Sequence, residues 1–561
     1  MTGAYRDRRA LVHRAVLAAA LALVTGLAYL GSFDGDFVAD DLQMVAPNPL
    51  LRSLDAQNIA QIFTSFDDAN YMPLKVLSLA VDQSLWGPEP FGYHVTNLLL
   101  HLGCALLIFS ILLALGFSRG AAFFVALLWA VHPLQVESVA WISERKNVLS
   151  GLFFFAAFRA YLVFSKRPRA LSYILTLLLY VLALLSKMNT LVLPAVCLAY
   201  EATFKMRYRW RDLAAAAPMF ALGALAAWYN LSGSPTHGGA YHGGSALVTW
   251  LSSSVVVFRY LGHAVLPIGL SSRYDVPLHG SPFDPPVLAS LLGLLGIAAL
   301  TLWLVRRKKR EAFWILWFAI TLAPMLNIIP FRTMMQDRYM YLALLGPLGL
   351  AGSVVDQRAS ARARRAAGGL ALALALASVL LTVRQVQYWA SPVAFWVRDA
   401  SVRPLYANDA IYRPGEYPGK LAALEAAVRE HPDDPTLLNN LGGLYFMASR
   451  FPEALSHFEK ASRLAPDEPF TLINLGRAYA RLGRFEEAEP PLRRATELRP
   501  YNSMPCYYLL RVYLHVGDAA NARRTLAQCS TLREGLAPER AALRRLEASE
   551  QSHVGADRGS P

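Results

Sequence analysis

The order of hydrophobic and polar positions divides the chain into two parts. Up to about Tyr388, long apolar runs alternate with short polar segments, whereas from about Trp389 onwards the chain is polar and rich in helix-forming residues. Apolar runs of this kind are typical of membrane helices, so we predict an all-α protein in which a polytopic membrane domain precedes a soluble helical domain. The predicted membrane domain, linker, repeat domain and disordered tail cover residues 1–388, 389–401, 402–548 and 549–561.

Twelve apolar segments are candidates for membrane helices, each of which needs about 20 residues to span a bilayer. They cover residues 11–30, 95–116, 120–136, 148–165, 171–186, 190–204, 213–231, 248–268, 287–305, 312–329, 338–355 and 367–387. Segment 248–268 is the least apolar, because it carries three consecutive serines, an arginine and a histidine. We interpret it as a re-entrant or interfacial helix that does not cross, which leaves about eleven crossings.

The predicted orientation follows from the basic residues of the loops, which favour the cytoplasmic side. Arginines before the first apolar run place the N-terminus inside, so loop 31–94 is the first outer loop. With about eleven crossings, every basic cluster falls inside, namely 166–169, 205–211, 306–310 and 362–365. The soluble domain then lies outside, together with the loops 31–94, 133–147, 232–286 and 330–337.

A 34-residue repeat organises the polar half of the chain. Asn440-Leu441-Gly442 recurs as Asn474-Leu475-Gly476, and tyrosines, alanines and prolines recur in the same register. Those positions are Tyr445, Tyr479, Tyr513, Ala454, Ala488, Ala522, Pro432, Pro466 and Pro500. The pattern resembles the tetratricopeptide repeat (TPR), whose stacked helical hairpins form a concave surface. We expect about four copies, the first degenerate, and a surface that binds a polypeptide; the alternative is a scaffold or dimer contact.

The composition agrees with this division. Of the 561 residues, 55% are hydrophobic and 17% are charged, which is too apolar for a soluble protein and too charged for a chain that lies in the membrane throughout. The net charge of +14 follows from the positive-inside distribution, because the basic clusters lie between apolar runs without interleaved aromatic residues. We therefore expect membrane lipids, and not nucleic acid, as partners of this charge.

An acidic pair opens the first outer loop, in the stretch Phe37-Val38-Ala39-Asp40-Asp41. Such a pair is ordinarily a helix cap next to a loop acid. At the edge of a membrane, however, a carboxylate can accept a proton from an acceptor hydroxyl, and its pKa is tuned by partial burial and by the neighbouring acid. Asp40 and Asp41 are therefore candidate catalytic bases, and the sequence does not distinguish between them.

Basic residues at outer ends of the predicted spans form a second group of candidates. Positive-inside statistics disfavour Arg145, Lys146 and Lys187 there, so their presence indicates an anionic ligand such as a phosphate. Arg338 occupies a similar position at another outer end. The alternative is a salt bridge, for example to Glu137. Further pocket candidates near these ends are His94, Asn97, His132, Glu137, Glu144, Arg332, Asp337 and Tyr341.

Two smaller sets of residues leave alternatives open. His94, Asn97 and His101 share one helical face, which permits a divalent metal, but their spacing matches no known metal motif, so a metal is not favoured. Cys506 and Cys529 fall in the last repeat, on two antiparallel helices whose ends meet. They form a disulfide in an oxidising compartment, or else they remain two core thiols.

Four of these stretches together resemble the membrane half of the TMTC-type (transmembrane and tetratricopeptide repeat) protein O-mannosyltransferases. They are Phe37 to Asp41, Tyr93 to Asn97, His132 to Asn147 and Asp337 to Tyr341. The repeat array resembles the second half of that family, so the resemblance covers nearly the whole chain. It implies the GT-C fold, a catalytic carboxylate at Asp40 or Asp41, and a donor phosphate held by Arg145, Lys146 and Arg338.

The resemblance implies a membrane glycosyltransferase that moves a sugar, most readily mannose, from a lipid phosphate to Ser or Thr hydroxyls of a polypeptide. Transfer would occur on the non-cytoplasmic side, with the TPR array binding the acceptor and the lipid-linked sugar as a co-substrate. A composition dense in Ala, Arg and Leu favours a bacterial inner membrane and a polyprenyl phosphate carrier; a eukaryotic source would imply the ER membrane.

Three alternative functions stay open from the sequence. One is a non-enzymatic, membrane-anchored TPR scaffold, and another is a GT-C enzyme that modifies a glycan or a lipid. A transporter is disfavoured, because the ionisable residues gather at span ends and not in mid-membrane.

Overall fold

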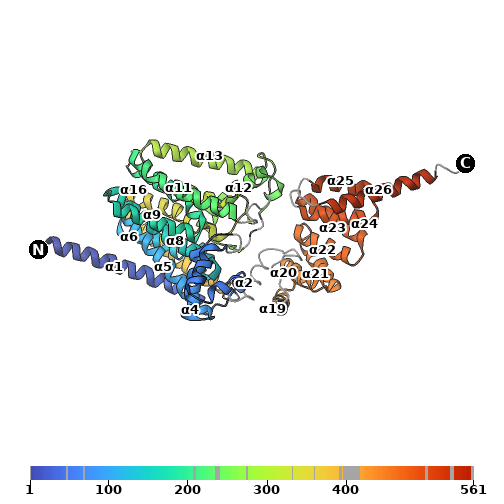
Figure 1. Cartoon of the computed structure of the whole chain (residues 1–561), viewed down its shortest axis with the longest axis horizontal. Helices are drawn as coiled ribbons and strands as arrows, with labels where there is room; N and C mark the ends of the chain where they lie inside the picture. The colour runs from blue at the N-terminus through green and yellow to red at the C-terminus, as the bar shows by residue number, and fades with distance from the viewer. Residues whose placement is uncertain are drawn as a thin grey trace. The chain divides into compact units, whose positions relative to one another are not determined.

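The computed structural model describes residues 2–45, 48–66, 70–205, 210–233, 241–272, 274, 276–331, 333–358, 360–390, 395, 417–499, 503–530 and 536–557. The elements in this part of the chain are helices, labelled in Figure 1, and the predicted all-α fold class is confirmed. The chain divides into two compact units. The N-terminal unit comprises residues 1–239, 254–272 and 289–395, and the C-terminal unit comprises residues 240–253, 273–288 and 396–561.

Each of the twelve apolar segments predicted from the sequence forms a helix. These helices are α1 (Thr2–Tyr29), α5 (Pro90–Ala114), α6 (Arg119–Ala130), α8 (Arg145–Lys166), α9 (Ala170–Ser186), α10 (Leu193–Tyr200), α11 (Trp210–Gly233), α12 (Ala246–Val265), α13 (Pro285–Arg306), α14 (Glu311–Leu322), α16 (Leu345–Arg358) and α17 (Ala361–Gln387). Several of them have the length and apolar composition of helices in a multi-pass membrane protein.

The number of crossings stays a prediction. Within the described ranges, six helices are long and apolar enough to cross a membrane, or up to eight if each of two bent helix pairs is one span. The segment predicted to be re-entrant lies in α12, which is not one of the six. The predicted total of about eleven crossings includes shorter apolar helices such as α9 and α14, whose 17 and 12 residues fall below the usual spanning length of about 20.

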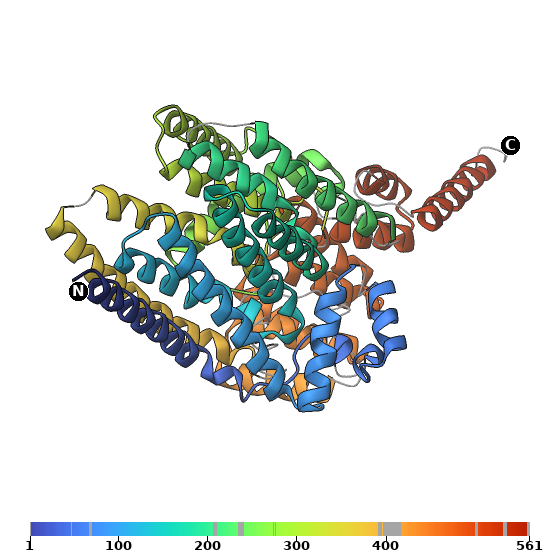
Figure 2. The same cartoon turned by 60° about the vertical axis from the view of Figure 1, so that its left-hand side comes forward.

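Aromatic side chains hold the membrane helices together. α8 packs against α5 and α9, and α1 runs beside α17, as the dark blue and dark yellow helices of Figure 2 show. Between α6, α8 and α14, the Phe155 ring lies 5.7 Å from Trp129 and 6.2 Å from Trp317, centroid to centroid. Such rings bury a large apolar area in a defined geometry, so this core fixes the ends of α6 and α8, where polar residues gather.

The segment predicted to be the first outer loop contains several short helices among its described residues. These are α2 (Asp41–Met44), η2 (Pro49–Leu51), α3 (Ala56–Thr64) and α4 (Pro73–Trp86). They share a buried cluster that includes Val45, Ile62, Leu79 and Tyr93, and Ile142 joins this cluster from the segment just before α8. The acidic pair of the loop is thereby brought beside residues 142–147.

Short helices also connect the longer ones elsewhere in the N-terminal unit. They are η1 (Leu30–Ser32), η3 (Pro133–Gln135), α7 (Val136–Ala140), η4 (Ile142–Glu144), η5 (Met188–Val192), the π-helix η6 (Glu201–Lys205), η8 (Ala323–Met325), η9 (Asp337–Tyr339) and α15 (Met340–Ala343). A further one, η7 (His242–Gly244), belongs to the C-terminal unit.

Antiparallel helix pairs build most of the C-terminal unit. The helices are α19 (Tyr417–Glu430), α20 (Pro435–Met447), α21 (Phe451–Leu464), α22 (Pro469–Arg481), α23 (Phe485–Leu498), α24 (Ser503–Val516), α25 (Ala519–Ser530) and α26 (Ala537–Asp557). The pairs α20–α21, α22–α23 and α24–α25 correspond to the three clear repeats. Residues 402–416 of the predicted first repeat lie outside the described residues. α26 extends to Asp557, within the segment 549–561 that is predicted to be a disordered tail.

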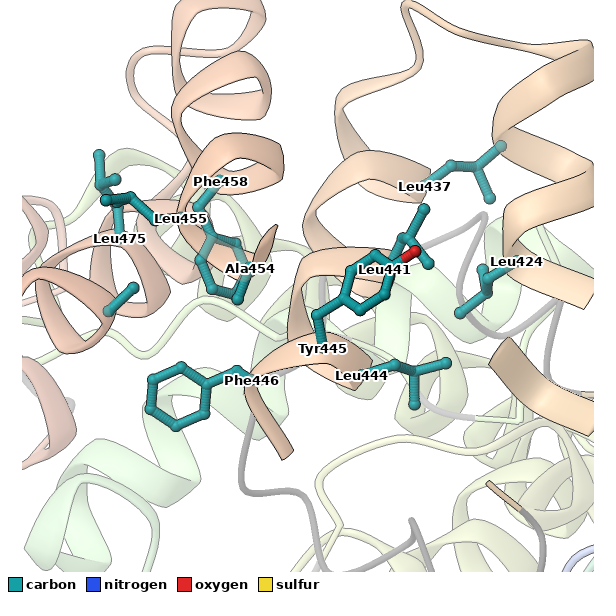
Figure 3. Close-up of a cluster of buried hydrophobic side chains, with 11 residues drawn as sticks. Leu424, Leu437, Leu441, Leu444, Tyr445, Phe446, Ala454, Leu455, Phe458 and Leu475 are labelled. Atoms are coloured by element: carbon teal, nitrogen blue, oxygen red, sulfur yellow. The ribbon is translucent and has the colours of Figure 1, made fainter. Parts of the chain in front are cut away.

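The repeated glycines let the two helices of a pair approach closely. A Cβ on Gly442 would lie 2.8 Å from Cε1 of Phe458, and one on Gly476 would lie 2.5 Å from Cγ of Leu492. Figure 3 shows the first of these interfaces, where Phe458 lies beside Ala454 and Leu424 of α19 lies across from α20. Glycine is therefore required for packing at these two positions.

The repeated tyrosines connect each hairpin to the one before it. Tyr445 donates to Glu425 at 2.8 Å and Tyr479 donates to Glu459 at 3.0 Å, and Tyr513 makes the equivalent bond to Glu489. Each glutamate lies on the helix directly before the one that carries its tyrosine, namely α19, α21 and α23. The same contact therefore recurs along the array, as expected for a solenoid whose repeats contact their neighbours.

The cysteines of the chain differ in their state. Cys104 and Cys197 are free and buried in the N-terminal unit. Cys506 is disulfide-bonded, and its predicted partner Cys529 lies outside the residues whose side chains the structure describes.

Candidate active site

The acidic pair lies on a strained turn of the first outer loop. Ala39 has a φ of 50°, a left-handed conformation that a residue with a Cβ rarely adopts and that costs free energy. Asp41 is fully buried. Its Oδ1 accepts hydrogen bonds from the backbone N–H and the hydroxyl of Ser143, the former at 2.6 Å, and its Oδ2 accepts from the N–H of Val38 at 3.2 Å. Asp40 is exposed.

The two acids therefore have different chemical environments. Burial raises the pKa of Asp41 to about 7, against the opposing effect of its hydrogen bonds to Ser143 and Val38. Asp41 connects the first outer loop to the segment before α8, 102 residues later in the sequence. Asp40, by contrast, is free to contact a molecule that approaches from solvent.

Next to Ser143 lies a group of five charged side chains that we call the ion cluster. Its members are Glu137, Glu144, Lys146, Lys187 and Arg338. Arg338 bridges the two glutamates, with Nη1 2.5 Å from Oε1 of Glu137 and Nε 3.3 Å from Oε1 of Glu144. The backbone N–H of Arg338 also donates to Oε2 of Glu137 at 2.8 Å. Lys146 Nζ lies 2.8 Å from the same Glu144 oxygen.

The ion cluster has the polarity of an anion site. The carboxylate side chains of Glu137 and Glu144 are buried, with exposed fractions of 3% and 1%. The side chains of Lys146 and Arg338 are more accessible, with exposed fractions of 20% and 15%. The cations therefore form the accessible part of the cluster. With Lys187 protonated, three positive charges face two negative ones, which leaves a net charge of +1 for an anionic ligand.

Lys187 belongs to this cluster although it follows a different helix, α9. Its Nζ donates to Oδ1 of Asn147 at 2.5 Å. Burial lowers the pKa of Lys187 to about 7, with Lys146 and Arg338 acting in the same direction and Glu144 opposing them. The charge of this ammonium group consequently changes near neutral pH.

Arg145 does not fit the predicted phosphate contact. Its side chain is fully buried, and Nη2 lies 2.5 Å from Oδ2 of Asp82. Nε donates to Asn97 at 2.7 Å, and the two Nη atoms donate to the carbonyl oxygens of Ser78 and Tyr93 at 3.1 and 2.8 Å. All three nitrogens thus bind the protein itself. Arg145 and Asn97 hold α4 and α5 against the start of α8.

His132 and Tyr341 make contacts that fix helix ends. Nδ1 of His132 accepts from the N–H of Leu134, and Nε2 lies 3.2 Å from the carbonyl oxygen of Ala264 in α12. The hydroxyl of Tyr341 lies 2.9 Å from Nδ1 of His101 in the core. Both predicted pocket residues are buried, with structural partners.

The remaining predicted pocket residues have mixed outcomes. His94 is buried beside Gly35, and neither ring nitrogen has a hydrogen-bond partner among the described residues. Asp337 is buried, with Oδ1 4.0 Å from Nδ1 of His263. Arg332 lies outside the described residues. Within the described ranges, no group of three or more His, Cys, Asp or Glu residues is placed to hold a metal ion.

Sequence reasoning did not single out three residues that join the site together. Ser143 holds Asp41, and Asp82 pairs with Arg145. Trp141 lies under Arg338, whose Cζ is 5.1 Å from the centre of a Trp141 ring. Trp141 and Ser143 both lie within the polar stretch 132–147, which was the available signal; no local pattern marks Asp82.

Known proteins resemble parts of the chain. Residues 433–500 match the family model of the tetratricopeptide repeat. Human protein O-mannosyl-transferase TMTC1 is 34% identical over 205 residues, which cover 33% of this chain and 23% of that protein. The resemblance to the TMTC-type family is confirmed. Human TMTC4 is 32% identical over 155 residues, which cover 23% of this chain and 20% of that protein.

These similarities have a limited extent. The chain spans less than a quarter of the length of the TMTC relatives TMTC1 and TMTC4 that it matches. Among solved structures, one match is the crystal structure of ArnT from Cupriavidus metallidurans bound to undecaprenyl phosphate. The aligned region covers 85% of this chain and 79% of the ArnT chain. Its sequence identity is 17% and its TM-score is 0.39, a likeness that does not establish a shared fold.

Proposed function

We propose that this chain is a membrane glycosyltransferase that moves mannose from a polyprenyl phosphate carrier to Ser or Thr hydroxyls of a polypeptide. One observation carries the proposal: the buried Asp41, next in sequence to the exposed Asp40, binds Ser143, and the residue after Ser143, Glu144, belongs to the ion cluster with its accessible cations. A transferase of this kind needs a base for the acceptor hydroxyl and cations for the departing phosphate. A scaffold has no need of either.

Asp40 is the proposed base, and Asp41 is the residue that positions it. A general base must reach the proton that it removes, so geometry decides before pKa does. Asp40 is exposed, whereas both oxygens of Asp41 already accept hydrogen bonds in a buried position. The raised pKa of Asp41, about 7, reflects that burial. The bonds to Ser143 hold the strained turn on which Asp40 is presented.

In the proposed step the acceptor oxygen attacks the anomeric carbon of the sugar while Asp40 takes the hydroxyl proton. The bond between that carbon and the phosphate oxygen breaks, and its electron pair leaves with the lipid phosphate. Arg338, Lys146 and Lys187 stabilise the negative charge that develops there. Glu137 and Glu144 fix the orientation of the Arg338 guanidinium through their ion pairs with it.

The TPR array is proposed to bind the acceptor polypeptide on the same side of the membrane. Stacked helical hairpins offer a concave surface that suits an extended chain. The disulfide-bonded Cys506 supports an oxidising, non-cytoplasmic compartment for this unit. That placement agrees with the orientation predicted from the basic loops, in which the N-terminus is cytoplasmic and the acidic pair lies outside.

A transfer assay in membranes tests the proposal. Labelled polyprenyl-phosphate mannose is supplied to membranes that contain the wild type, the Asp40→Asn/Asp41→Asn double variant or Asp34→Asn, an exposed acid of the same loop. We expect label in protein with the wild type and with Asp34→Asn, and a loss of at least about 100-fold with the double variant.

Two results would overturn the proposal. Full activity of the double variant would remove the acidic pair from the mechanism. The absence of transfer to protein from several lipid-linked sugars, while the TPR array still captures a polypeptide, would favour the scaffold. Label that enters a glycan or lipid in place of protein would keep the enzyme class and correct the acceptor.

A further inference from the structure

The chain leaves the N-terminal unit at the candidate active site. Two residues after the end of α17, the ring of Trp389 stacks on that of Trp141, with centroids 5.2 Å apart and planes inclined by 25°. Phe395 packs against Trp389 as well, with the two ring centroids 5.1 Å apart. The carbonyl of the next residue, Ala390, accepts a hydrogen bond from the N–H of Asp36 at 2.9 Å. The start of the linker therefore contacts both segments that build the site.

Trp389 is not an ordinary interfacial tryptophan. Tryptophans that anchor a span at the membrane surface expose part of the ring to lipid and water. Trp389 is only 4% exposed, and its neighbours Trp141 and Phe395 are equally buried. Trp303 on α13 is 51% exposed and provides the contrasting case. The buried stack indicates a role inside the protein.

Trp141 connects the stacked ring of Trp389 to the candidate active site. Its ring lies beneath the guanidinium of Arg338, with Cζ 5.1 Å from the ring centre. Its carbonyl accepts the N–H of Glu144 at 3.1 Å, which closes the turn that presents Ser143 to Asp41. Its indole N–H is buried and has no hydrogen-bond partner among the described residues. A buried donor without a partner is costly, and an oxygen of a bound ligand would satisfy it.

We propose that Trp141 contacts the lipid phosphate through the indole N–H, and that Trp389 is a positioning residue that holds Trp141 under Arg338. The inference rests on the proposed function and adds two residues to its donor site. It also means that the tether of the TPR array forms part of the wall of that site. Ring stacking and the cation–π contact act together, because Trp141 contacts both Trp389 and Arg338.

Matched variants of the full chain in nanodiscs separate the two roles. Trp389→Phe keeps an aromatic ring for stacking, Trp389→Ala removes it, and Trp141→Phe keeps the ring but removes the N–H. Trp303→Ala is the control for loss of a tryptophan. The first measurement is the affinity for polyprenyl phosphate, and the second is hydrogen exchange over residues 136–147.

The two proposed roles predict different patterns. We expect Trp389→Ala to weaken binding by about tenfold, the equivalent of one aromatic pair, and to speed exchange in 136–147. Trp389→Phe and Trp303→Ala should stay close to the wild type. Trp141→Phe should weaken binding by a factor of about 5 to 10, because it removes one hydrogen bond, without faster exchange.

Combining Trp389→Ala with Arg338→Lys tests whether Trp389 acts through the arginine. The double variant should bind more tightly than the product of the single losses predicts. Independent, multiplicative losses would overturn the positioning role, and so would unchanged exchange in Trp389→Ala. Wild-type affinity of Trp141→Phe would overturn the donor contact. If the wild type itself neither binds the lipid phosphate nor transfers sugar, the proposed function fails, while the exchange result still decides the role of Trp389.

Discussion

The two units of this chain use polar side-chain contacts in opposite ways. In the C-terminal unit one solution is repeated, so that a tyrosine hydroxyl meets a glutamate of the preceding hairpin at each of three junctions. In the N-terminal unit each polar contact occurs once and joins distant segments, such as Asp41 to Ser143 across 102 residues and Arg338 to Glu137 across 201. The repeated contacts stabilise an array, whereas the unique contacts assemble one chemical site.

Among the variants that test this comparison, we expect the largest loss of activity and stability from substitution of Arg338. Removal of its guanidinium leaves Glu137 and Glu144 buried without that cation, a change that costs about 3–5 kcal/mol when a buried ion pair is broken. We expect Arg338→Ala to abolish sugar transfer and to lower the thermal stability of the N-terminal unit.

The matched control lies on the repeat array. Arg494 pairs with Asp467 at 2.8 Å on an exposed surface, where solvent screens an ion pair. Arg494→Ala should therefore leave both transfer and melting nearly unchanged. Arg338→Lys keeps the charge without the fork that reaches both glutamates, and intermediate activity is expected. Equal effects of Arg338→Ala and Arg494→Ala would break the comparison.

Close helix packing gives the next largest effect, this time in the repeats. Gly476→Ala places a Cβ 2.5 Å from Cγ of Leu492 and 3.0 Å from the carbonyl oxygen of Ala488, so a helix must shift. We expect a loss of about 1–3 kcal/mol in the stability of the C-terminal unit, measured by hydrogen exchange of α22 and α23. Gly296→Ala on α13, where no described atom lies within 4 Å, should show no loss.

A smaller effect concerns pH and the ion cluster. The pKa of Lys187 is lowered to about 7, so the side chain is charged below that pH and neutral above it. Affinity for a polyprenyl phosphodiester, whose single charge is constant in this range, should fall as the pH rises through about 7. Lys187→Arg should remove the fall, since arginine stays charged. A wild-type affinity that is flat between pH 6 and 9 would show that Lys187 does not contact the anion.

The smallest change in stability is expected at Ser449, where one repeat departs from the other two. Residues 449, 483 and 517 end the first helix of each hairpin with positive φ, and two of them are glycine, whereas the first is Ser449 with a φ of 60°. A residue with a Cβ in this conformation costs about 1 kcal/mol, so Ser449→Gly should stabilise the array by about that amount. Thermal unfolding of the variant provides the measurement, and a lowered melting temperature would contradict the packing account.

The sequence was sufficient wherever the signal is local or periodic. Apolar runs located the twelve helices that correspond to the predicted membrane segments, but not short helices such as α3 and α4, and the 34-residue period located the three clear hairpins. The contacts of single polar residues were not predictable in this way. Arg145 was expected to bind phosphate because it is basic on the outer side, but its partner Asp82 lies 63 residues earlier and follows no pattern. The contrast between Asp40 and Asp41 likewise depends on a distant partner, Ser143.

The central claim is that the cation face of the ion cluster binds the lipid phosphate next to Asp40. A structure of the full chain with polyprenyl phosphate bound tests it most directly. The account predicts the phosphate within hydrogen-bonding reach of Arg338 and Lys187, with Asp40 facing the position of the sugar. A phosphate held instead at the basic segment 306–310, away from the acidic pair, would contradict the account.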